Sequence, residues 1–390
     1  MAGTLRALPV DLLREFSVPL IAGVVAAVAW ANLFPSSYIA FVYTPLWRGV
    51  TFHFLSNDVF MVLFFGIAAV EITDSISPGG SLNPIHKALN PLLATFGGIT
   101  GPAAIYLALN AAFGSPRLAR GWGIPTATDI ALAWLAARLV FGKRHPAISF
   151  LLLLAVADDA IGLFIIAVFY PDPAHPTRPM ALLLVAAAMA VAFALRKRRI
   201  NSYWPYLILG GAPAWAGMCL ANLHPALALV FVVPFMPHHR HSKDETVFMA
   251  HYEDRTALAD FERDWKIVVD FGLFFFGLAN AGVAFSSIGA VTWMVLAALI
   301  GGKAIGIFGL GLLGCTLGLP LPRGIGKREL LLVGVIAGTG LTVALFVAGV
   351  AFVNPQVQGA AKMGALLSAA AGPIGLVLAR LLGVRPRRDE

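Results

Sequence analysis

The stretch Leu151-Leu-Leu-Leu-Ala-Val-Ala-Asp-Asp-Ala-Ile-Gly162 decides the fold of this chain. It places two adjacent carboxylates, Asp158 and Asp159, in an apolar run that approaches the roughly 20 residues needed to cross a bilayer and continues beyond Gly162. An ionisable side chain at the bilayer centre costs roughly 2.5–3.5 kcal/mol on insertion scales, so such residues are rare and usually face a cavity. The stretch therefore predicts a membrane helix with an ion-binding centre.

The composition extends this interpretation to the whole chain. Of its 390 residues, 59% are hydrophobic and 12% are charged, and the mean hydropathy is +0.82. Soluble globular domains are closer to half apolar and a quarter charged. Two cysteines, Cys219 and Cys315, are too few for a disulfide framework or a structural zinc site. The first apolar run is followed by no small-residue cleavage site, so we expect no cleaved signal peptide.

Apolar runs predict an all-α membrane protein with about twelve transmembrane helices. The predicted spans are residues 17–34, 56–72, 91–113, 121–141, 147–169, 179–195, 203–219, 222–236, 266–284, 290–314, 329–353 and 360–382. The seventh and eighth spans are short and meet at a tight link. The loops between the spans are too short for a soluble domain, so we expect one transmembrane domain over residues 1–390.

Basic residues orient the predicted spans. Of the 28 Lys and Arg residues, 22 lie at the two ends of the chain and in every second loop, and Lys303 and Lys362 lie within spans. The opposite loops hold only Arg48, Arg117, Arg120 and Arg178. Cytoplasmic loops carry such an excess, so we expect both termini in the cytoplasm and the chain in a bacterial inner membrane. The net charge of +8 then reflects topology, and we expect no nucleic-acid partner.

Charged side chains in the interior of spans point to ion transport. Lys303 lies in the tenth predicted span and Asp129 in the fourth. One of Asp158 and Asp159 is the obvious partner of Lys303; whether the lysine is only a counter-ion or takes part in a proton cycle stays open. Two neighbouring carboxylates cannot both ionise cheaply in a low dielectric, and carboxylate oxygens suit hard cations. The pair therefore favours exchange of protons and cations, with simple ion pairing between helices as the alternative.

Two spans contain sequences that break a helix. In Gly121-Trp-Gly-Ile-Pro-Thr-Ala-Thr-Asp-Ile-Ala131, Pro125 and the glycines precede Asp129. The eleventh span contains Ala337-Gly-Thr-Gly-Leu-Thr342, with Gly338 and Gly340. Unpaired backbone at membrane depth is tolerated only against protein or a water-filled cavity. The half-helix ends also carry partial charges that an acidic and a basic side chain can offset, and Asp129 and Lys303 are the candidates.

A weak internal similarity links the two broken spans. Aligning residues 127–132 with 340–345 places Thr342 opposite Asp129. The fourth and eleventh spans are an odd number of spans apart, so they run in opposite directions. This indicates inverted repeats formed by spans three to five and ten to twelve, although chance similarity between segments of small residues is the alternative.

Taken together, these segments resemble the NhaA family of sodium/proton antiporters, for which inverted repeats and broken helices are a known architecture. The matching segments, in order over nearly the full length, are Gly123–Ala131, Asp158-Asp159 with Gly162, Asn280-Ala-Gly-Val283, Gly302-Lys-x-x-Gly306 and Gly338–Thr342. The resemblance implies two broken helices that cross at the site.

The resemblance also implies roles for individual residues. Asp158 and Asp159 look like the ion- and proton-binding pair, with Asp159 the more direct Na+ ligand. Thr128 and Asp129 look like site residues at the crossing, and we expect them beside Asp159. Lys303 looks like the partner of Asp158 and a compensator of helix dipoles.

Three polar residues near span ends match family positions linked to pH response: Asp58, Glu71 and His224. From the residues alone, interfacial or packing roles are favoured for all three. The chain departs from the family pattern after Glu71, at Ile72-Thr-Asp-Ser75, and at Asp264-Trp-Lys266. We expect these departures to affect pH control more than the transport site.

These observations predict an antiporter that exports Na+ or Li+ in exchange for protons by alternating access. Protons and Na+ compete for Asp158 and Asp159, and the resemblance implies electrogenic, pH-regulated exchange. We expect no cofactor and no enzymatic activity. The expected partners are Na+, protons and the lipid bilayer, and a homodimer is left open.

Three rival functions remain from the sequence. A sodium-coupled organic-anion symporter of related fold could use Lys303 to bind the anion. A channel would share the span pattern. An intramembrane aspartyl protease commonly carries Gly-x-Gly-Asp, which does not occur in this sequence.

Overall fold

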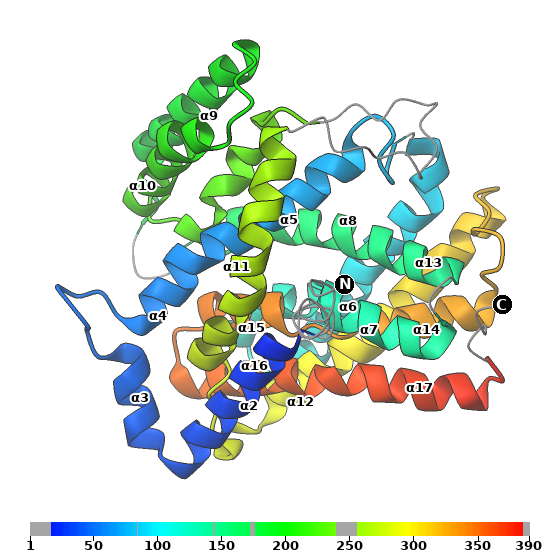
Figure 1. Cartoon of the computed structure of the whole chain (residues 1–390). Helices are drawn as coiled ribbons and strands as arrows, with labels where there is room; N and C mark the ends of the chain where they lie inside the picture. The colour runs from blue at the N-terminus through cyan, green and yellow to red at the C-terminus, as the bar shows by residue number, and fades with distance from the viewer. Residues whose placement is uncertain (1–16, 84, 143–144, 172–175, 239–255, 385–390) are drawn as a thin grey trace, which may run out of the picture. The chain divides into compact units, whose positions relative to one another are not determined.

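The computed structural model describes residues 17–83, 85–142, 145–171, 176–238 and 256–384, which form helices, turns and loops but no strand (Figure 1). Six of these helices are long and apolar enough to cross a membrane, and the number rises to eight if each of two bent helix pairs is one span. This agrees with an all-α, multi-pass membrane protein. The count of twelve spans stays a prediction.

The chain forms two compact units, each assembled from segments that are distant in the sequence. The first unit takes residues 1–41, 88–162 and 277–390, and the second takes 42–87 and 163–276. Both bent helix pairs and the Asp158–Asp159 pair belong to the first unit. The assignment of all residues to one transmembrane domain stays a prediction.

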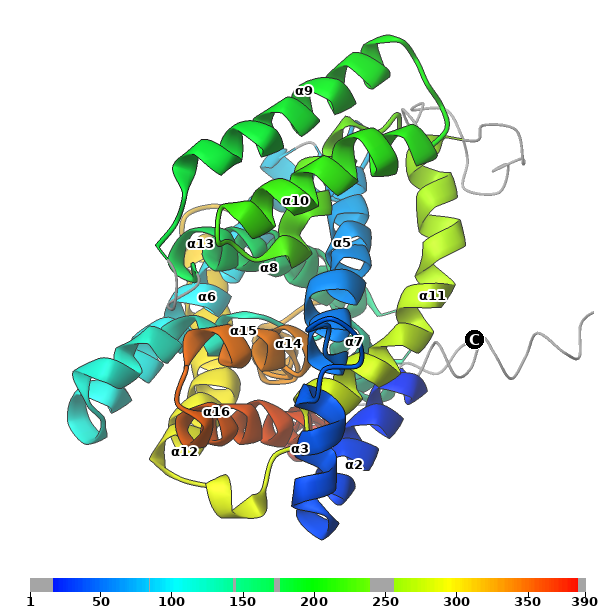
Figure 2. The same ribbon diagram turned by 90° about the vertical axis from the view of Figure 1, so that its left-hand side faces the viewer.

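The first unit is built from long helices and short irregular turns. Its helices are α2 (Val18–Leu33), most of α6 (Ile85–Phe113), α7 (Ile130–Phe141), the larger part of α8 (Pro146–Phe169), α12 (Ala290–Ala297), α13 (Lys303–Thr316), α14 (Lys327–Ala337), α15 (Thr342–Ala351), α16 (Pro355–Leu367) and α17 (Ala371–Leu381). The turns are the 3-10 segments η2 (Pro116–Thr126), η7 (Phe285–Ser287) and η9 (Ser368–Ala370) and the π-helical segment η8 (Ala298–Gly302). Helices α12 and α16 lie side by side (Figures 1 and 2), where the Thr292 hydroxyl donates to the Ala360 carbonyl at 2.8 Å.

Local sequence explains where these helices begin. Asn354 stands before α16, and its side-chain oxygen accepts from the N–H groups of Gln356 at 2.9 Å and Val357 at 3.3 Å. Pro355 is the first helical residue, where the missing N–H of proline costs nothing. The interruption between α15 and α16 therefore has a clear chemical origin.

Helices α6 and α13 approach each other through glycines. A Cβ added at Gly97 would clash with the backbone carbonyl of Gly306, and one added at Gly306 would clash with the carbonyl of Gly97. One turn away, a Cβ at Gly302 would lie 2.5 Å from the Cα of Pro102. Glycines spaced four apart let membrane helices pack backbone to backbone. This contact fixes α13, which begins at Lys303, against α6.

The second unit contains α5 (Met61–Ile76), preceded by α4 (Phe52–Phe54) and the π-helical segment η1 (Leu55–Phe60). It also holds α9 (Leu182–Lys197) after the turn η3 (Pro179–Ala181), η4 (Tyr206–Gly211) with α10 (Ala212–Leu220), the 3-10 segments η5 (Pro225–Phe231) and η6 (Val233–Phe235), and most of α11 (Ala257–Asn280). Helices α9 and α10 run alongside each other (Figure 2). The short helix α3 (Pro35–Tyr43) lies across a unit boundary.

Candidate functional site

Two helix breaks meet in the first unit. Segments η2 and α7 are bent by 56°, and α14 and α15 by 50°. The N–H of Asp129, in the first break, donates to the carbonyl of Thr339, in the second, at 2.7 Å. The N–H that the first break frees and the carbonyl that the second break frees therefore bond each other. Buried backbone at membrane depth requires such partners.

The residues predicted to break these helices occupy both bends. Pro125 lies in η2, Gly338 follows α14 and Gly340 lies in the second break. A Cβ at Gly338 would lie 2.8 Å from the Leu299 carbonyl oxygen, and one at Gly340 would lie 2.9 Å from the carbonyl oxygen of Ala127. Both glycines are therefore required by close backbone packing as well as by the bend.

Asp129 is a cap shared by two helices. Its Oδ1 accepts from the N–H of Leu132 at 3.1 Å, at the start of α7. Its Oδ2 accepts from the N–H of Thr342 at 3.3 Å and from the Thr342 hydroxyl at 3.1 Å, at the start of α15. The side chain is buried. A carboxylate is favourable there because each helix N-terminus carries a partial positive charge.

Asp158, Lys303 and Thr128 form a buried polar cluster beside the breaks. Lys303 forms an ion pair with Oδ2 of Asp158, and both side chains are fully buried. The Lys303 Nζ also donates to the Thr128 hydroxyl at 2.7 Å. That hydroxyl lies 2.8 Å from Asp158 Oδ2 and 3.0 Å from the Ala337 carbonyl, and its single proton can serve one of them at a time.

The two aspartates of the pair differ in their surroundings. Asp158 is 1% exposed, and its Oδ1 has no hydrogen-bond partner within the described ranges. Asp159 is partly exposed. Successive side chains on a helix point about 100° apart. One carboxylate is thus held by an ammonium, while its neighbour is more accessible.

The cluster offers oxygen atoms of three kinds for a cation: carboxylate, hydroxyl and backbone carbonyl. Hard cations prefer such oxygen ligands. Among the described residues, no group of three or more His, Cys, Asp or Glu side chains could hold a metal ion. The carboxylate, hydroxyl and carbonyl oxygens are donors of the kind that hard cations prefer.

The structure brings together most of the predicted site residues in the first unit. Lys303 lies against Asp158, the partner that the family resemblance implied. Thr342 bonds Asp129, a contact between the two broken spans that the sequence analysis did not predict. Thr128 was expected beside Asp159, but the contact that the structure shows is with Asp158.

Sequence reasoning missed two backbone carbonyls, those of Ala337 and Thr339. They complete the contact between the breaks by accepting from Thr128 and Asp129. The break sequence pointed to this region, but the choice of individual carbonyls depends on how two distant segments meet.

The residues predicted to respond to pH lie in the second unit, where each has its own partners. Glu71 lies 3.6 Å from the Nζ of Lys266, which also bonds Glu262 at 2.8 Å. This three-residue cluster on α5 and α11 was not foreseen as a group.

Asp58 and His224 have other neighbours. The backbone carbonyl of Asp58 accepts from Trp215 Nε1 at 2.7 Å. The Nε2 of His224 lies 2.5 Å from the Tyr170 carbonyl oxygen, which fixes the imidazole beside the end of α8. These contacts do not test the predicted pH response of Asp58 and His224.

Comparison with known proteins gives full-length matches. The family model described as Na+/H+ antiporter 1 matches residues 14–379. A protein named Na+/H+ antiporter NhaA from Geobacter sulfurreducens is 64% identical over 96% of this chain and 98% of its own length. Proteins of the same name from Geobacter metallireducens and Desulfitobacterium hafniense are 63% and 58% identical, each over 97% of this chain and over 98% and 97% of their own lengths.

Proposed function

The chain belongs to the Na+/H+ antiporter 1 family, and on this premise we propose that it exchanges Na+ or Li+ for protons across a membrane. The observation that carries the proposal is the buried Asp158 carboxylate, which holds Lys303 with one oxygen and leaves the other without a partner among the described residues. The proposal makes the chain a secondary transporter that needs no cofactor.

The ion site that we propose consists of Asp158 and Asp159, with Thr128 as a neutral oxygen donor. A cation entering the site competes with the Lys303 ammonium for Asp158, because both neutralise the same carboxylate. Protons compete in turn for the carboxylates. One site then cannot hold both cargoes at once, and competition of this kind couples proton entry to sodium export.

Asp129 and Lys303 support this site electrostatically. We propose that Asp129 stabilises the N-terminal ends of α7 and α15, which its carboxylate caps. Lys303 prevents Asp158 from standing as an uncompensated charge at membrane depth, which would be costly. The breaks at Pro125, Gly338, Gly340 and Thr342 supply the irregular backbone that transporters use around their sites.

The topology of the proposal has four parts. Twelve spans cross a bacterial inner membrane with both termini in the cytoplasm, and two inverted repeats carry the crossing broken helices. Alternating access then means that two conformations expose the same site to opposite sides, with the gradients setting their populations. A homodimer in the lipid bilayer is compatible with this arrangement. The proposed contributors to pH response are Glu71, His224 and Asp58.

The organic-anion symporter is not favoured. Its cation for binding an anion would be Lys303, but Lys303 is already paired with Asp158 and bonded to Thr128. The relatives at 58–64% identity are named as Na+/H+ antiporters, which also does not support this alternative.

The decisive experiment measures proton flux in liposomes that contain the purified protein and a pH-sensitive dye. Adding Na+ should move protons in the unmodified protein, and Asp159→Asn should abolish the flux. Asp264→Asn is the matched control, because Asp264 bonds Tyr203 at 3.0 Å in the second unit and has no proposed part in transport. Retained flux in Asp159→Asn would refute the site assignment.

A further inference from the structure

Helix α8, which carries the aspartate pair (Figure 1), contains a buried glycine with free space beside it. Gly162 is buried, yet a Cβ built on it would meet no atom of the described residues within 4 Å. Gly301, Gly309 and Gly349 also have room for a Cβ, but these three residues are partly or fully exposed. Protein interiors are close-packed, so room for a side chain at a buried position is unusual.

The usual structural reasons for a glycine do not apply to Gly162. It lies within a continuous α-helix, and its φ is not in the left-handed region. No neighbouring backbone approaches it closely, in contrast to the contact between Gly97 and Gly306. Glycine in a helix interior costs about 1 kcal/mol relative to alanine. The residue therefore lowers the stability of α8 without improving the packing of the described residues.

The position of residue 162 along α8 suggests what the missing side chain achieves. Residues three and four apart lie on one face of a helix, so residue 162 shares a face with Asp159 and Asp158. Helical side chains lean toward the N-terminus and cover the turn before their own Cα. A bulky side chain at residue 162 would therefore extend over the two carboxylates.

The exposure of the two aspartates shows which carboxylate such a side chain would affect most. Asp158 is 1% exposed and is paired with Lys303. Asp159 is partly exposed. An ion that reaches the pair from water therefore meets Asp159 first, and Asp159 lies three residues before Gly162.

We propose that Gly162 keeps the approach to Asp159 open, so that a cation can reach the aspartate pair. The absence of a side chain is the property that matters at this position. The size of residue 162 then sets the Na+ concentration that the exchange requires. This inference rests on the proposed function, because it concerns access to the same carboxylates.

The first test changes the size of residue 162 and measures Na+-dependent proton flux in liposomes. Gly162→Leu should raise the Na+ concentration for half-maximal flux by about tenfold or more. Gly162→Ala adds only a methyl group in free space, so it should raise that concentration by a smaller factor and should not lower the melting temperature.

Gly309→Leu is the matched control, because Gly309 also has room for a Cβ but lies exposed on α13. It should leave the half-maximal Na+ concentration unchanged. A Gly162→Leu protein that melts like the unmodified protein and needs no more Na+ would overturn the proposal.

A second test does not depend on Gly162→Leu folding well. The Gly162→Cys thiol should react with aminoethyl methanethiosulfonate, a small water-soluble cation, because water supports the reactive thiolate. Mass spectrometry of the peptide that contains residue 162 separates this reaction from that of the native Cys219 and Cys315. Gly309→Cys is the control: it is more exposed, but it lies in the apolar span Ala290–Thr316 and should react more slowly. Slower reaction at residue 162 than at residue 309 would overturn the open approach.

Na+ connects the labelling to the ion site. In the Gly162→Cys protein, NaCl should slow labelling relative to choline chloride at the same ionic strength, and the added change Asp159→Asn should remove this effect. Labelling that Na+ does not slow, in a protein that still exchanges Na+ for protons, would overturn the link between residue 162 and the pair. If the unmodified protein shows no Na+-dependent flux, the proposed function fails, while the labelling rates still decide whether the space beside Gly162 opens to water.

Discussion

The carboxylate of Asp129 accepts hydrogen bonds from both the N–H and the hydroxyl of Thr342, a residue 213 positions later in the chain. The same carboxylate caps α7 through Leu132. One side chain therefore holds the starts of two half-helices, and the two breaks depend on each other for their geometry.

Replacing Asp129 separates the contribution of its cap from that of its charge. Asp129→Asn retains an oxygen acceptor, and Asn caps helices about as well as Asp. Asp129→Ala leaves the N–H groups of Leu132 and Thr342 without this acceptor, at about 1–3 kcal/mol for each buried group. Melting temperatures in one detergent should fall in the order unmodified, Asn, Ala. Equal temperatures for Asn and Ala would contradict the shared cap.

Thr128→Val should weaken the ion site more than the fold. The substitution keeps the volume but removes the hydroxyl that contacts Lys303, Asp158 and the Ala337 carbonyl. We expect the Na+ concentration for half-maximal proton flux to rise by about tenfold, which corresponds to about 1.4 kcal/mol. The measurement is the flux in liposomes over a range of Na+ concentrations. Thr100→Val is the control, because it removes the hydroxyl of a partly exposed threonine on α6 that bonds the Phe96 carbonyl at 2.8 Å. The same rise in both variants would exclude a local effect.

Ser368 should stabilise the second break. Ser368→Ala leaves the buried N–H of Gly340 without its side-chain acceptor, and we expect a loss of about 1–3 kcal/mol of stability. Thermal unfolding of the purified protein measures this loss. Ser202→Ala, at an exposed position, should change the melting temperature little. A melting temperature for Ser368→Ala that matches that of Ser202→Ala would show that the hydrogen bond between Ser368 and Gly340 contributes nothing to stability.

Gly306→Ala should disrupt the contact between α6 and α13. The added methyl group would overlap the carbonyl of Gly97, so the two backbones must separate. We expect lower stability and slower Na+-dependent proton flux, because α13 begins at Lys303. Gly309→Ala is the matched control on the same helix, since nothing lies within 4 Å of a Cβ there. Alanine at that position should be neutral or stabilising by up to about 1 kcal/mol. Similar losses in both variants would rule out the packing explanation.

The sequence predicted the features that depend on charged or helix-breaking residues inside apolar spans. A charged residue in an apolar span, such as Lys303, needs an opposite charge beside it, and few acidic residues lie within the predicted spans. The break residues were also recognisable, because proline and clustered glycine are poor inside a helix. Hence the pairing of Lys303 with one of the two adjacent aspartates could be inferred from the residues, and the family resemblance implied Asp158. The contact between Thr342 and Asp129 was not predicted, because the alignment of the two breaks only made these positions equivalent in the repeats.

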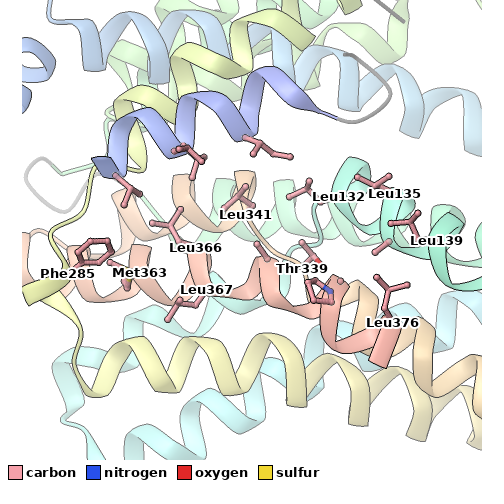
Figure 3. Close-up of a pocket in the computed structure, with 18 residues that line it drawn as sticks. Leu132, Leu135, Leu139, Phe285, Thr339, Leu341, Met363, Leu366, Leu367 and Leu376 are labelled. Carbon is pink, nitrogen blue, oxygen red and sulfur yellow. The ribbon is translucent and has the colours of Figure 1, made fainter. Parts of the chain in front are cut away.

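The features that the sequence could not predict depend on ordinary groups brought together by packing. Every residue has a carbonyl, so nothing marked that of Thr339 as the acceptor for Asp129. Likewise, no pattern pointed to the hydrogen bond between Thr128 and Asp158, because that contact depends on how α8 is rotated. The apolar cavity that α2, α7, α16 and α17 line beside the second break arises from side chains on helices that are far apart in the sequence (Figure 3).

The glycine contact between α6 and α13 also has a consequence for how this chain can evolve. Gly97 and Gly306 each touch backbone of the other helix, and backbone cannot be replaced by a smaller group. A side chain at either position requires the two backbones to separate, which a smaller side chain at a neighbouring position does not achieve. Random mutation should therefore accumulate at Gly309 and Gly349, which have open space around them, and should be rare at Gly97 and Gly306.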